Sequence, residues 1–298
     1  MQQIAETTCP FCGETKSKAS FYAPIRFNEK QFVYRKCLNC NLNYNVPLLT
    51  PDDYEKLYAV SYHDEYYFKE ERDFSNQLAI LKQVKDIISV IDFGCGDATF
   101  LNKLQINGYT CTGVEFNPEL VKRLALTYPA ITFYTVEDFF AKKDQFDCAH
   151  LGDVLEHMVK PAETIKNLSR KIRAGGYLFV EGPIEHNASI GYYFRKSFFS
   201  LAKKLNPARV ADGAPYHTFL ANRKNQLNFF NLMGYSTSFM KIYEAPWPFP
   251  EKLADAKSFK LMVEYIVAKI SVTVAKVFRQ LGNRFYFLGK KQADSFQS

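Results

Sequence analysis

The sequence predicts an α/β fold: an open, mostly parallel sheet with helices on both faces, preceded by a small cysteine-rich segment. Two observations lead to this prediction. From Ser89 onward, short apolar strands alternate with stretches of helical periodicity. Residues 1–46 are rich in Asn and aromatic side chains and carry paired cysteines.

The alternating region predicts seven strands. They span residues 89–93, 109–114, 131–136, 146–151, 177–180, 235–243 and 284–288. Residues 97–107 have apolar side chains at helical spacing, and Asn117-Pro118 is typical of an N-cap and first helical turn. A further helix is expected over residues 161–172, and Gly175-Gly176 is expected to separate it from the next strand.

A long amphipathic helix is expected near the C-terminus. Apolar residues between positions 259 and 281 follow i, i+3/i+4 spacing. We expect this stripe to pack in the core, with membrane or partner binding as the alternative. Its members include Phe259, Met262, Ile266, Ile270 and Val277.

The composition fits one large domain with a small appendage. The 298 residues are 47% hydrophobic and 23% charged, which provides a sizeable core. No run of about 18 uncharged apolar residues and no signal peptide is found, so a cytoplasmic protein without a transmembrane segment is expected. The predicted division is a zinc-binding module at 1–46, linker or lid helices at 47–87, and a catalytic domain at 88–298.

Positive charge is concentrated in two segments. Of the net charge of +7, residues 257–291 hold eight Lys/Arg against one acid, and residues 190–224 hold seven against one, so the remainder is acidic. This asymmetry predicts an anionic partner on the C-terminal side: a phosphate-bearing molecule, nucleic acid or a membrane surface. Solvated helix faces are an equally good explanation.

A glycine turn follows the first strand of the alternating region. Residues 92–97 (DFGCGD) end that strand and precede a helix, where glycines permit a tight turn and close approach to a ligand. Glu115 ends the second strand 19 residues after Gly96, the spacing of a ribose-binding acid. Asp92 would repel a pyrophosphate but suits a positively charged group. The pattern therefore favours S-adenosylmethionine (SAM) over a dinucleotide.

Three segments resemble class I SAM-dependent methyltransferases. The first motif of these enzymes is similar to VIDFGCGDATFL, and their second-strand acid motif to GVEFNPELV. The segment FDCAHLGDVLEHMVKPAETIKNLSRKIRAGGYLFVEGP resembles the stretch from strand four to strand five of these enzymes. The similarity is to the ubiquinone-biosynthesis-like and sugar-methyltransferase-like branch. The resemblance is close over residues 88–182 and loose over 215–240. It implies a Rossmann-like sheet of seven strands, the last antiparallel, and methyl transfer from SAM.

The resemblance also implies the cofactor contacts. Glu115 would accept hydrogen bonds from both ribose hydroxyls, Asp138 would bind the adenine amino group, and Asp92 suits the methionine end. A solvated strand-end acid is the alternative for Glu115 and Asp138. The expected site is completed by the turn Gly94, Cys95 and Gly96, by Phe116 and Phe139 near the adenine ring, and by Asp153 and Val154 after strand four.

Four cysteines form a CxxC…CxxC pattern. Cys9 and Cys12 are separated by 24 residues from Cys37 and Cys40, and each CxxC turn can aim two thiolates at one ion. The pattern predicts a structural Zn²⁺ site; four free buried thiols are the alternative. Cysteine-rich modules of this kind also precede some sugar C-methyltransferases, which the chain resembles in layout.

Three histidines are candidates for the base that a hydroxyl or carbon-acid acceptor requires. His157 follows strand four, His186 follows strand five, and His217 precedes the helix before strand six. For each of them, a surface or capping residue is the alternative. A lid over SAM, or interdomain packing, is expected for Tyr62, Tyr66 and Tyr67.

The sequence thus predicts methyl transfer from SAM to a small, anionic acceptor, with a sugar or nucleotide-linked precursor as the leading class. An RNA methyltransferase is one alternative, although strand four ends in Gly-Asp-Val-Leu instead of an Asn-Pro-Pro-Tyr-like motif. A non-catalytic module that binds SAM and zinc is the other, and the intact set of acids and glycines argues against it. Nucleic acid is disfavoured as the partner, and peripheral membrane contact stays open.

Overall fold

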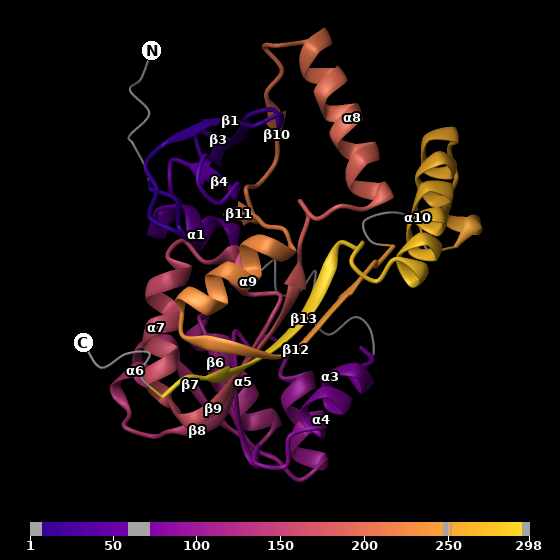
Figure 1. Ribbon diagram of the computed structural model, residues 1–298. Helices are drawn as coiled ribbons and strands as arrows, with labels where there is room; N and C mark the ends of the chain where they lie inside the picture. Colours follow the sequence, from indigo (N-terminus) through magenta and orange to yellow (C-terminus); the bar gives the residue numbers. More distant parts are fainter. Residues whose placement is uncertain (1–7, 59–71, 247–249, 251, 294–298) are drawn as a thin grey trace. The chain divides into compact units, whose positions relative to one another are not determined.

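The computed structural model describes residues 8–58, 72–246, 250 and 252–293 (Figure 1). The chain divides into two compact units. The first comprises Met1–Thr50, Gly182–Phe229 and Met240–Tyr286, and the second Pro51–Glu181, Phe230–Phe239 and Phe287–Ser298. The tyrosines expected to form a lid, Tyr62, Tyr66 and Tyr67, lie outside the described residues.

A seven-stranded sheet in the order β12-β13-β9-β8-β5-β6-β7 organises the second unit. Neighbouring strands from β9 to β7 pair in parallel, and β13 is antiparallel. This confirms the predicted Rossmann-like sheet. Its strands are β5 (Ser89–Phe93), β6 (Thr110–Glu115), β7 (Thr132–Thr135), β8 (Phe146–Gly152), β9 (Ile172–Pro183), β12 (Tyr235–Tyr243) and β13 (Arg284–Lys291).

Helices cover this sheet. Four successive residues of β5, Val90 to Phe93, are buried, so both faces of the central strand are covered. Helix α5 begins as predicted, because the Asn117 side chain accepts hydrogen bonds from the N–H groups of Glu119 and Leu120. The helices of this unit are α1 (Pro51–Leu57), α3 (Ser75–Leu81), α4 (Thr99–Ile106), α5 (Pro118–Thr127), α6 (Val136–Ala141), α7 (Pro161–Lys171) and the short η1 (Leu155–His157).

One predicted boundary is wrong. Gly175 and Gly176 do not form a turn between α7 and the next strand; they lie inside β9, which begins at Ile172 directly after the helix. A Cβ on Gly176 would lie 2.8 Å from the carbonyl oxygen of Asp147 on β8. Glycine is therefore required here by close packing between strands.

A smaller, six-stranded sheet belongs to the first unit. Its N-terminal strands are β1 (Ser17–Ala19), β2 (Ile25–Phe27), β3 (Lys30–Cys37) and β4 (Asn43–Val46). Two short strands from much later in the chain complete it: β10 (Ala211–Asp212) pairs with β2, and β11 (Phe219–Leu220) pairs with β4. Phe11 stacks on Phe229, in the second half of α9 (Arg223–Leu232), with 4.2 Å between the ring centroids. Residues 1–46 thus share both sheet and core with residues 211–229.

Two long helices, α8 (Ile190–Leu205) and α10 (Phe259–Val277), contact each other in the first unit, and the short η2 (Leu253–Asp255) precedes α10. The predicted amphipathic helix is present as α10, but the expectation that its large apolar residues form core is wrong. Its buried residues are the small Ala268, Ser271 and Ala275, and Ser271 Oγ accepts a hydrogen bond from the Gly191 N–H of α8 at 3.3 Å. Among the described helices, none combines the length and apolarity needed to cross a membrane.

Candidate functional site

The turn after β5 brings backbone to the carboxyl ends of the strands. Gly94 and Gly96 have φ angles of +81° and +55°. A Cβ on Gly94 would lie 2.6 Å from Cγ2 of Val154, so this position requires glycine. Ala98 and Asp153 also have positive φ angles, 58° and 54°, which are strained for residues with a Cβ. Strain of this kind is concentrated at ligand sites, so this edge of the sheet is the candidate cofactor site.

Glu115 connects this turn to the end of β6. Its Oε2 accepts a hydrogen bond from Gly96 N at 3.0 Å, and its Oε1 accepts one from Phe116 N at 2.8 Å. Burial raises the pKa of the carboxyl, and the backbone N–H groups oppose that shift. The acid is therefore fixed against the glycine turn.

The other expected cofactor residues lie in different surroundings. Phe116 is exposed, whereas Phe139 is buried and its ring packs on Phe140 at 5.3 Å, so only Phe116 presents a ring to solvent. Asp138 is exposed at the start of α6, where its carboxylate accepts a hydrogen bond from Thr135 Oγ1 at 2.8 Å. Cys95 is buried, and its Sγ would lie 3.0 Å from a Cβ on Gly113.

Asp92 is bound to a histidine that the sequence analysis did not select. His150 of β8 lies beside Asp92 of β5 in the sheet register, and its Nδ1 donates to Asp92 Oδ1 at 2.7 Å. Its Nε2 donates to Glu181 Oε1 at 3.2 Å. Gln77 of α3 donates its Nε2 to both oxygens of Glu181, at 3.0 and 2.9 Å. All four side chains are buried, and together they form one hydrogen-bonded chain.

His150 is positively charged in this hydrogen-bonded row of side chains. Burial opposes the charge, but the carboxylates of Asp92 and Glu181 raise the pKa of His150 to about 9. The imidazole ring is held in place by two phenylalanine rings. The ring centroids of Phe100 and Phe179 lie 4.4 and 5.0 Å from that of His150. One imidazolium between two carboxylates leaves a negative charge in excess, directly before the glycine turn.

His157 ends η1 and is held by tyrosines from the segment at α1. The Tyr58 hydroxyl lies 2.9 Å from His157 Nδ1, and the Tyr54 hydroxyl donates to the His157 carbonyl oxygen. Burial raises the pKa of Tyr54. The Tyr58–His157 contact anchors the end of η1.

His186 lies in a buried polar cluster of the first unit. Ser20 Oγ donates to Asn43 Oδ1 at 2.8 Å, which turns the Asn43 amide nitrogen toward His186 Nδ1, 2.9 Å away. The ring proton is then on Nε2, which donates to the Tyr22 hydroxyl at 3.1 Å. Burial lowers the pKa of His186 to about 4, so the ring is neutral at pH 7.

His217, in the same unit, is oriented by a carboxylate. Its Nδ1 donates to Glu185 Oε2 at 3.0 Å, and its carbonyl oxygen accepts hydrogen bonds from Tyr34 and Asn45. Burial opposes ionisation of Glu185, but His217 and the positive charge of Arg195 hold its pKa below the usual value. A carboxylate that accepts a hydrogen bond from Nδ1 orients the imidazole, as in the histidine of a general base.

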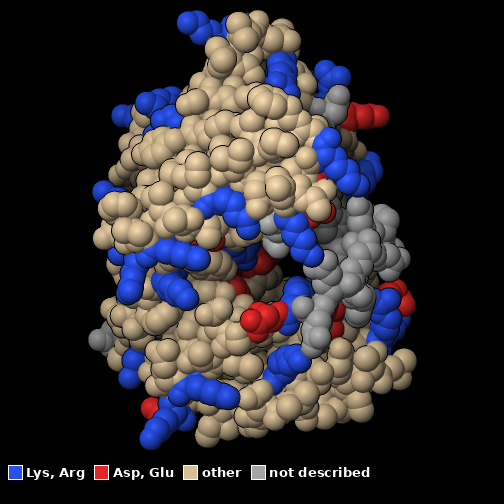
Figure 2. Space-filling view, turned by 90° about the vertical axis from the view of Figure 1, so that its right-hand side faces the viewer, with Lys and Arg blue, Asp and Glu red and all other residues tan. Residues whose placement is uncertain are grey.

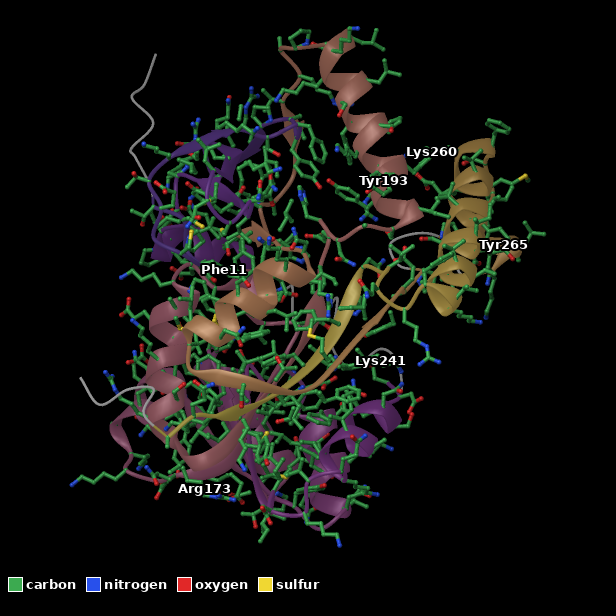
Figure 3. All side chains as sticks on the ribbon, in the orientation of Figure 1. Phe11, Arg173, Tyr193, Lys241, Lys260 and Tyr265 are labelled. Carbon is green, nitrogen blue, oxygen red and sulfur yellow. The ribbon has the colours of Figure 1, made fainter. Side chains whose placement is uncertain are left out.

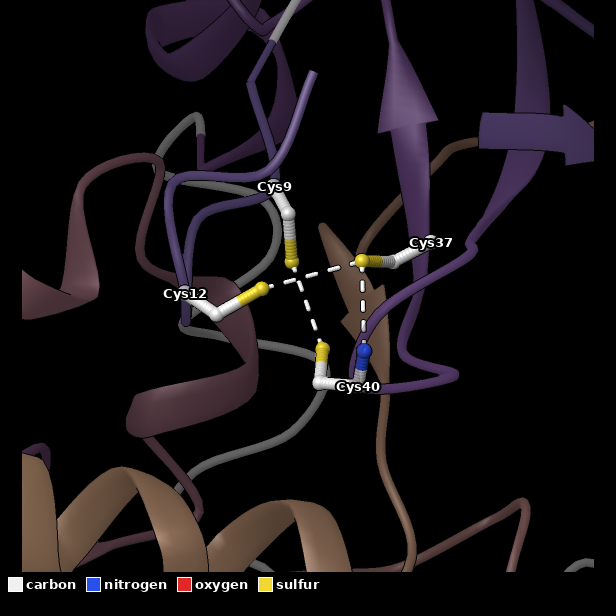
Figure 4. Close-up of side chains that lie close together, drawn as sticks. All are labelled: Cys9, Cys12, Cys37 and Cys40. Carbon is white, nitrogen blue, oxygen red and sulfur yellow. Dashed lines mark hydrogen bonds between the residues drawn. The ribbon is translucent and has the colours of Figure 1, made fainter. Parts of the chain in front are cut away.

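The four paired cysteines converge on one point (Figure 4). Cys9 Sγ lies 3.6 Å from Cys40 Sγ, and Cys12 Sγ lies 3.7 Å from Cys37 Sγ. A zinc ion with tetrahedral sulfur ligands at about 2.3 Å gives S···S separations of about 3.8 Å. The hydrogen bond from Cys9 lowers the pKa of Cys40 to about 5 and raises that of Cys9, so the thiols cannot all ionise without a cation. The donor set and spacing fit Zn²⁺.

Comparison with known proteins decides the family. A family model described as a methyltransferase domain matches residues 63–231, which is more than half of the chain. The chain belongs to this methyltransferase family. It is therefore a SAM-dependent enzyme with a class I fold, as the sequence predicted. No curated protein matches the sequence.

Solved structures share the fold of this methyltransferase. A SAM-dependent methyltransferase from Archaeoglobus fulgidus is 18% identical, with a TM-score of 0.50 over 78% of this chain and all of that one. A putative methyltransferase from Haloferax volcanii, solved with the Trm112 methyltransferase activator, is 13% identical. Its TM-score is 0.52, and the match covers 81% of this chain and 96% of that one.

The structure adds functional candidates to this methyltransferase that sequence reasoning missed. His150 lies inside the predicted strand 146–151 and Glu181 directly after the predicted strand 177–180, and neither was selected as a candidate. An ionisable residue inside a strand that is buried on both faces requires a partner. His150 could have been selected as a candidate on this ground. Tyr22, Glu185 and Asn43 were missed because their partners are more than 30 residues away in the chain.

Proposed function

We propose that this methyltransferase modifies a small, anionic acceptor, with sugar- and nucleotide-linked precursors as the class to test first. The observation that carries this proposal is the Glu185–His217 pair with Arg195 close enough to lower the pKa of Glu185. A carboxylate-oriented histidine suits removal of a proton from a hydroxyl or carbon acid. A guanidinium suits a phosphate or carboxylate on the same molecule.

In this proposal SAM is held by the second unit. Glu115 accepts hydrogen bonds from the ribose hydroxyls, and Phe116 and Asp138 lie on the adenine side. Asp92, with Glu181 behind His150, provides negative charge for the cationic methionine end. Gln77 supports the fit, because its buried Oε1 accepts no hydrogen bond from any described residue and is thus available to a donor of the ligand.

Bound SAM would supply a methyl group activated by a positive sulfonium. Its transfer to the acceptor lone pair would break the carbon–sulfur bond, and the sulfur would keep that electron pair. His217 Nε2 takes the acceptor proton, and Glu185 stabilises the resulting imidazolium. His186 remains neutral and orients the Tyr22 hydroxyl. His157 is assigned to holding η1 through Tyr58.

A structural Zn²⁺ at Cys9, Cys12, Cys37 and Cys40 completes the proposal. The four sulfurs occupy every position of a tetrahedral site, which leaves none for catalysis. None of the seven cysteines forms a disulfide, and a reducing compartment keeps thiols in that state. We accordingly place the enzyme in the cytoplasm.

The test is a methyl-transfer assay with labelled SAM and two acceptor pools: nucleotide sugars and total RNA. We expect label only in the nucleotide-sugar pool. His217→Gln should lower kcat in that assay and leave the Kd for SAM unchanged, since His217 has no place in the cofactor site. Label in RNA alone would reject the acceptor class, and SAM binding without any transfer to either pool would reject it as well.

A further inference from the structure

Helix α10 carries a line of exposed, large apolar side chains. At 3.6 residues per turn, their positions fall within about 80° of the helix circumference, so the stripe is continuous. The opposite side carries the small buried residues. This distribution is the reverse of a core helix. The stripe consists of Phe259, Met262, Ile266, Ile270 and Val277, which are between 44% and 84% exposed.

Helix α8, which contacts α10, has the same property. Its exposed apolar residues lie within about 140° of the circumference. Figure 3 labels Tyr193 on α8 and Lys260 and Tyr265 on α10. Soluble monomers rarely expose so many large apolar residues on adjoining elements without a binding partner. The α8 residues are Tyr193, Phe198, Leu201 and Leu205, each more than half exposed.

The charges beside these stripes are almost all positive. Helix α8 contains no acid, and its exposed cations are Lys196 and Lys204, since Lys203 donates to the carbonyl oxygens of Ser20 and Tyr22. Helix α10 contains three lysines and one acid. That acid, Glu264, is only 20% exposed and is paired with Lys260 at 3.8 Å, whereas Lys260 is 78% exposed. Lys269 and Lys276 are also exposed, on one flank of the α10 stripe. The surface thus combines apolar stripes with unbalanced positive charge.

We propose that α8 and α10 form a docking surface for an anionic lipid bilayer. Amphipathic helices with large apolar residues and flanking lysines lie in the membrane interface, with the apolar side at the acyl boundary and the lysines at the headgroups. A symmetric contact with a second copy would place the same positive charges opposite each other. Charge complementarity therefore selects the lipid surface. This proposal does not depend on the acceptor proposed above.

The test is vesicle flotation of the full chain, without SAM or acceptor, using phosphatidylcholine alone or mixed with phosphatidylglycerol. We expect flotation with the mixed vesicles only, weakening as salt is added. Ile266→Glu/Ile270→Glu should lower partitioning about tenfold or more. Lys269→Gln/Lys276→Gln should lower it about fivefold for each lysine. Leu126→Glu is the matched control, because Leu126 is 86% exposed on α5 and lies outside this surface.

The changed residues are exposed, so all variants should melt at the wild-type temperature. Failure of the wild type to float with anionic vesicles overturns the proposal. Equal flotation of wild type and Ile266→Glu/Ile270→Glu does so too. Sedimentation velocity tests whether a second copy of the chain binds this surface instead. If the wild type is a dimer, if Ile266→Glu/Ile270→Glu dissociates it, and if no vesicle binding occurs, the surface is a dimer interface and the lipid proposal is overturned.

Discussion

Buried acids set the properties of the cofactor edge at the scale of single residues. Glu115 is held by backbone N–H groups, and Asp92 is held by His150. A buried carboxylate is costly unless it is paired or hydrogen-bonded, so these partners are what make an acidic edge tolerable in the folded state. The first two predictions remove one acid and one partner.

Replacing Glu115 with Ala should weaken SAM binding severely. Two hydrogen bonds to a charged group, each contributing about 1.5–3 kcal/mol, correspond to a loss of affinity of about 100-fold or more. Calorimetric titration with SAM measures it. Glu119→Ala is the control, because Glu119 is an exposed acid on α5 that pairs with Lys122. Unchanged affinity in Glu115→Ala would remove Glu115 from the cofactor site.

Replacing His150 with Asn or Gln should separate its two hydrogen bonds. The Asn amide can keep the bond of Nδ1 to Asp92, and the longer Gln amide can keep that of Nε2 to Glu181. If Asp92 holds the methionine end of SAM, affinity should fall further in His150→Gln than in His150→Asn. Equal SAM affinity in the two variants would contradict that role for Asp92.

The same histidine should make stability depend on pH. Its pKa rises from 6.5 in the unfolded chain to about 9 in the folded one, so the folded state binds the proton more tightly. This stabilisation is complete below pH 6.5 and is lost as the pH rises through 9. Urea unfolding between these values should show a slope that both variants lack; an identical slope in His150→Asn would show that another group titrates.

The role of a single residue could not be predicted from the sequence where its hydrogen-bond partner is distant in the chain. Local spacing alone predicts that Glu115 and the glycine turn belong to one site, and the structure has a hydrogen bond between them. The role of His150 could not be predicted in this way, because it depends on the register of β5 against β8, 58 residues apart. Phe139 illustrates the opposite case: its place beside a candidate acid suggested adenine contact, but packing on Phe140 and Phe146 fills its surroundings.

At the scale of elements, local patterns determined β5, β12 and the start of α5, whereas long-range pairing determined the first unit. Strands β10 and β11 are two residues each and have no pattern of their own. They are strands only because β2 and β4 offer them an edge. Periodicity likewise located α10 correctly, yet it cannot tell whether a stripe faces core or solvent.

Cys37→Ser should therefore destabilise more than the segment 1–46. Wild-type protein should contain one zinc per chain, and the variant should lose it. Because Phe11 packs on Phe219 and Phe229, proteolysis should reach residues 211–229 as well as the N-terminal strands. SAM affinity should stay within about twofold, since the residues proposed to bind SAM lie in the second unit. Cys111→Ser, a buried cysteine of β6, is the control that keeps its metal. Absence of stoichiometric zinc in the wild type would reject the site.

At the scale of the whole molecule, charge is distributed unevenly along the chain. Lys and Arg side chains stand out over the face shown in Figure 2, with fewer acids among them. The basic segments 190–224 and 257–291 both lie largely in the first unit, whereas the acids proposed to hold SAM belong to the second.

The last prediction tests whether this charge serves the acceptor. Apparent acceptor affinity, measured with SAM saturating and no lipid present, should weaken as salt rises, because the Debye length falls from about 10 Å at 0.1 M to about 3 Å at 1 M. Arg195→Ala should weaken it further and flatten the salt dependence, since Arg195 interacts with Glu185 and His186. Lys204→Ala, an exposed cation at the end of the same helix, should leave acceptor affinity unchanged. If Arg195→Ala and Lys204→Ala have equal effects, or neither salt nor Arg195 matters, the basic segments serve another partner, and the lipid surface remains as the reason for their charge.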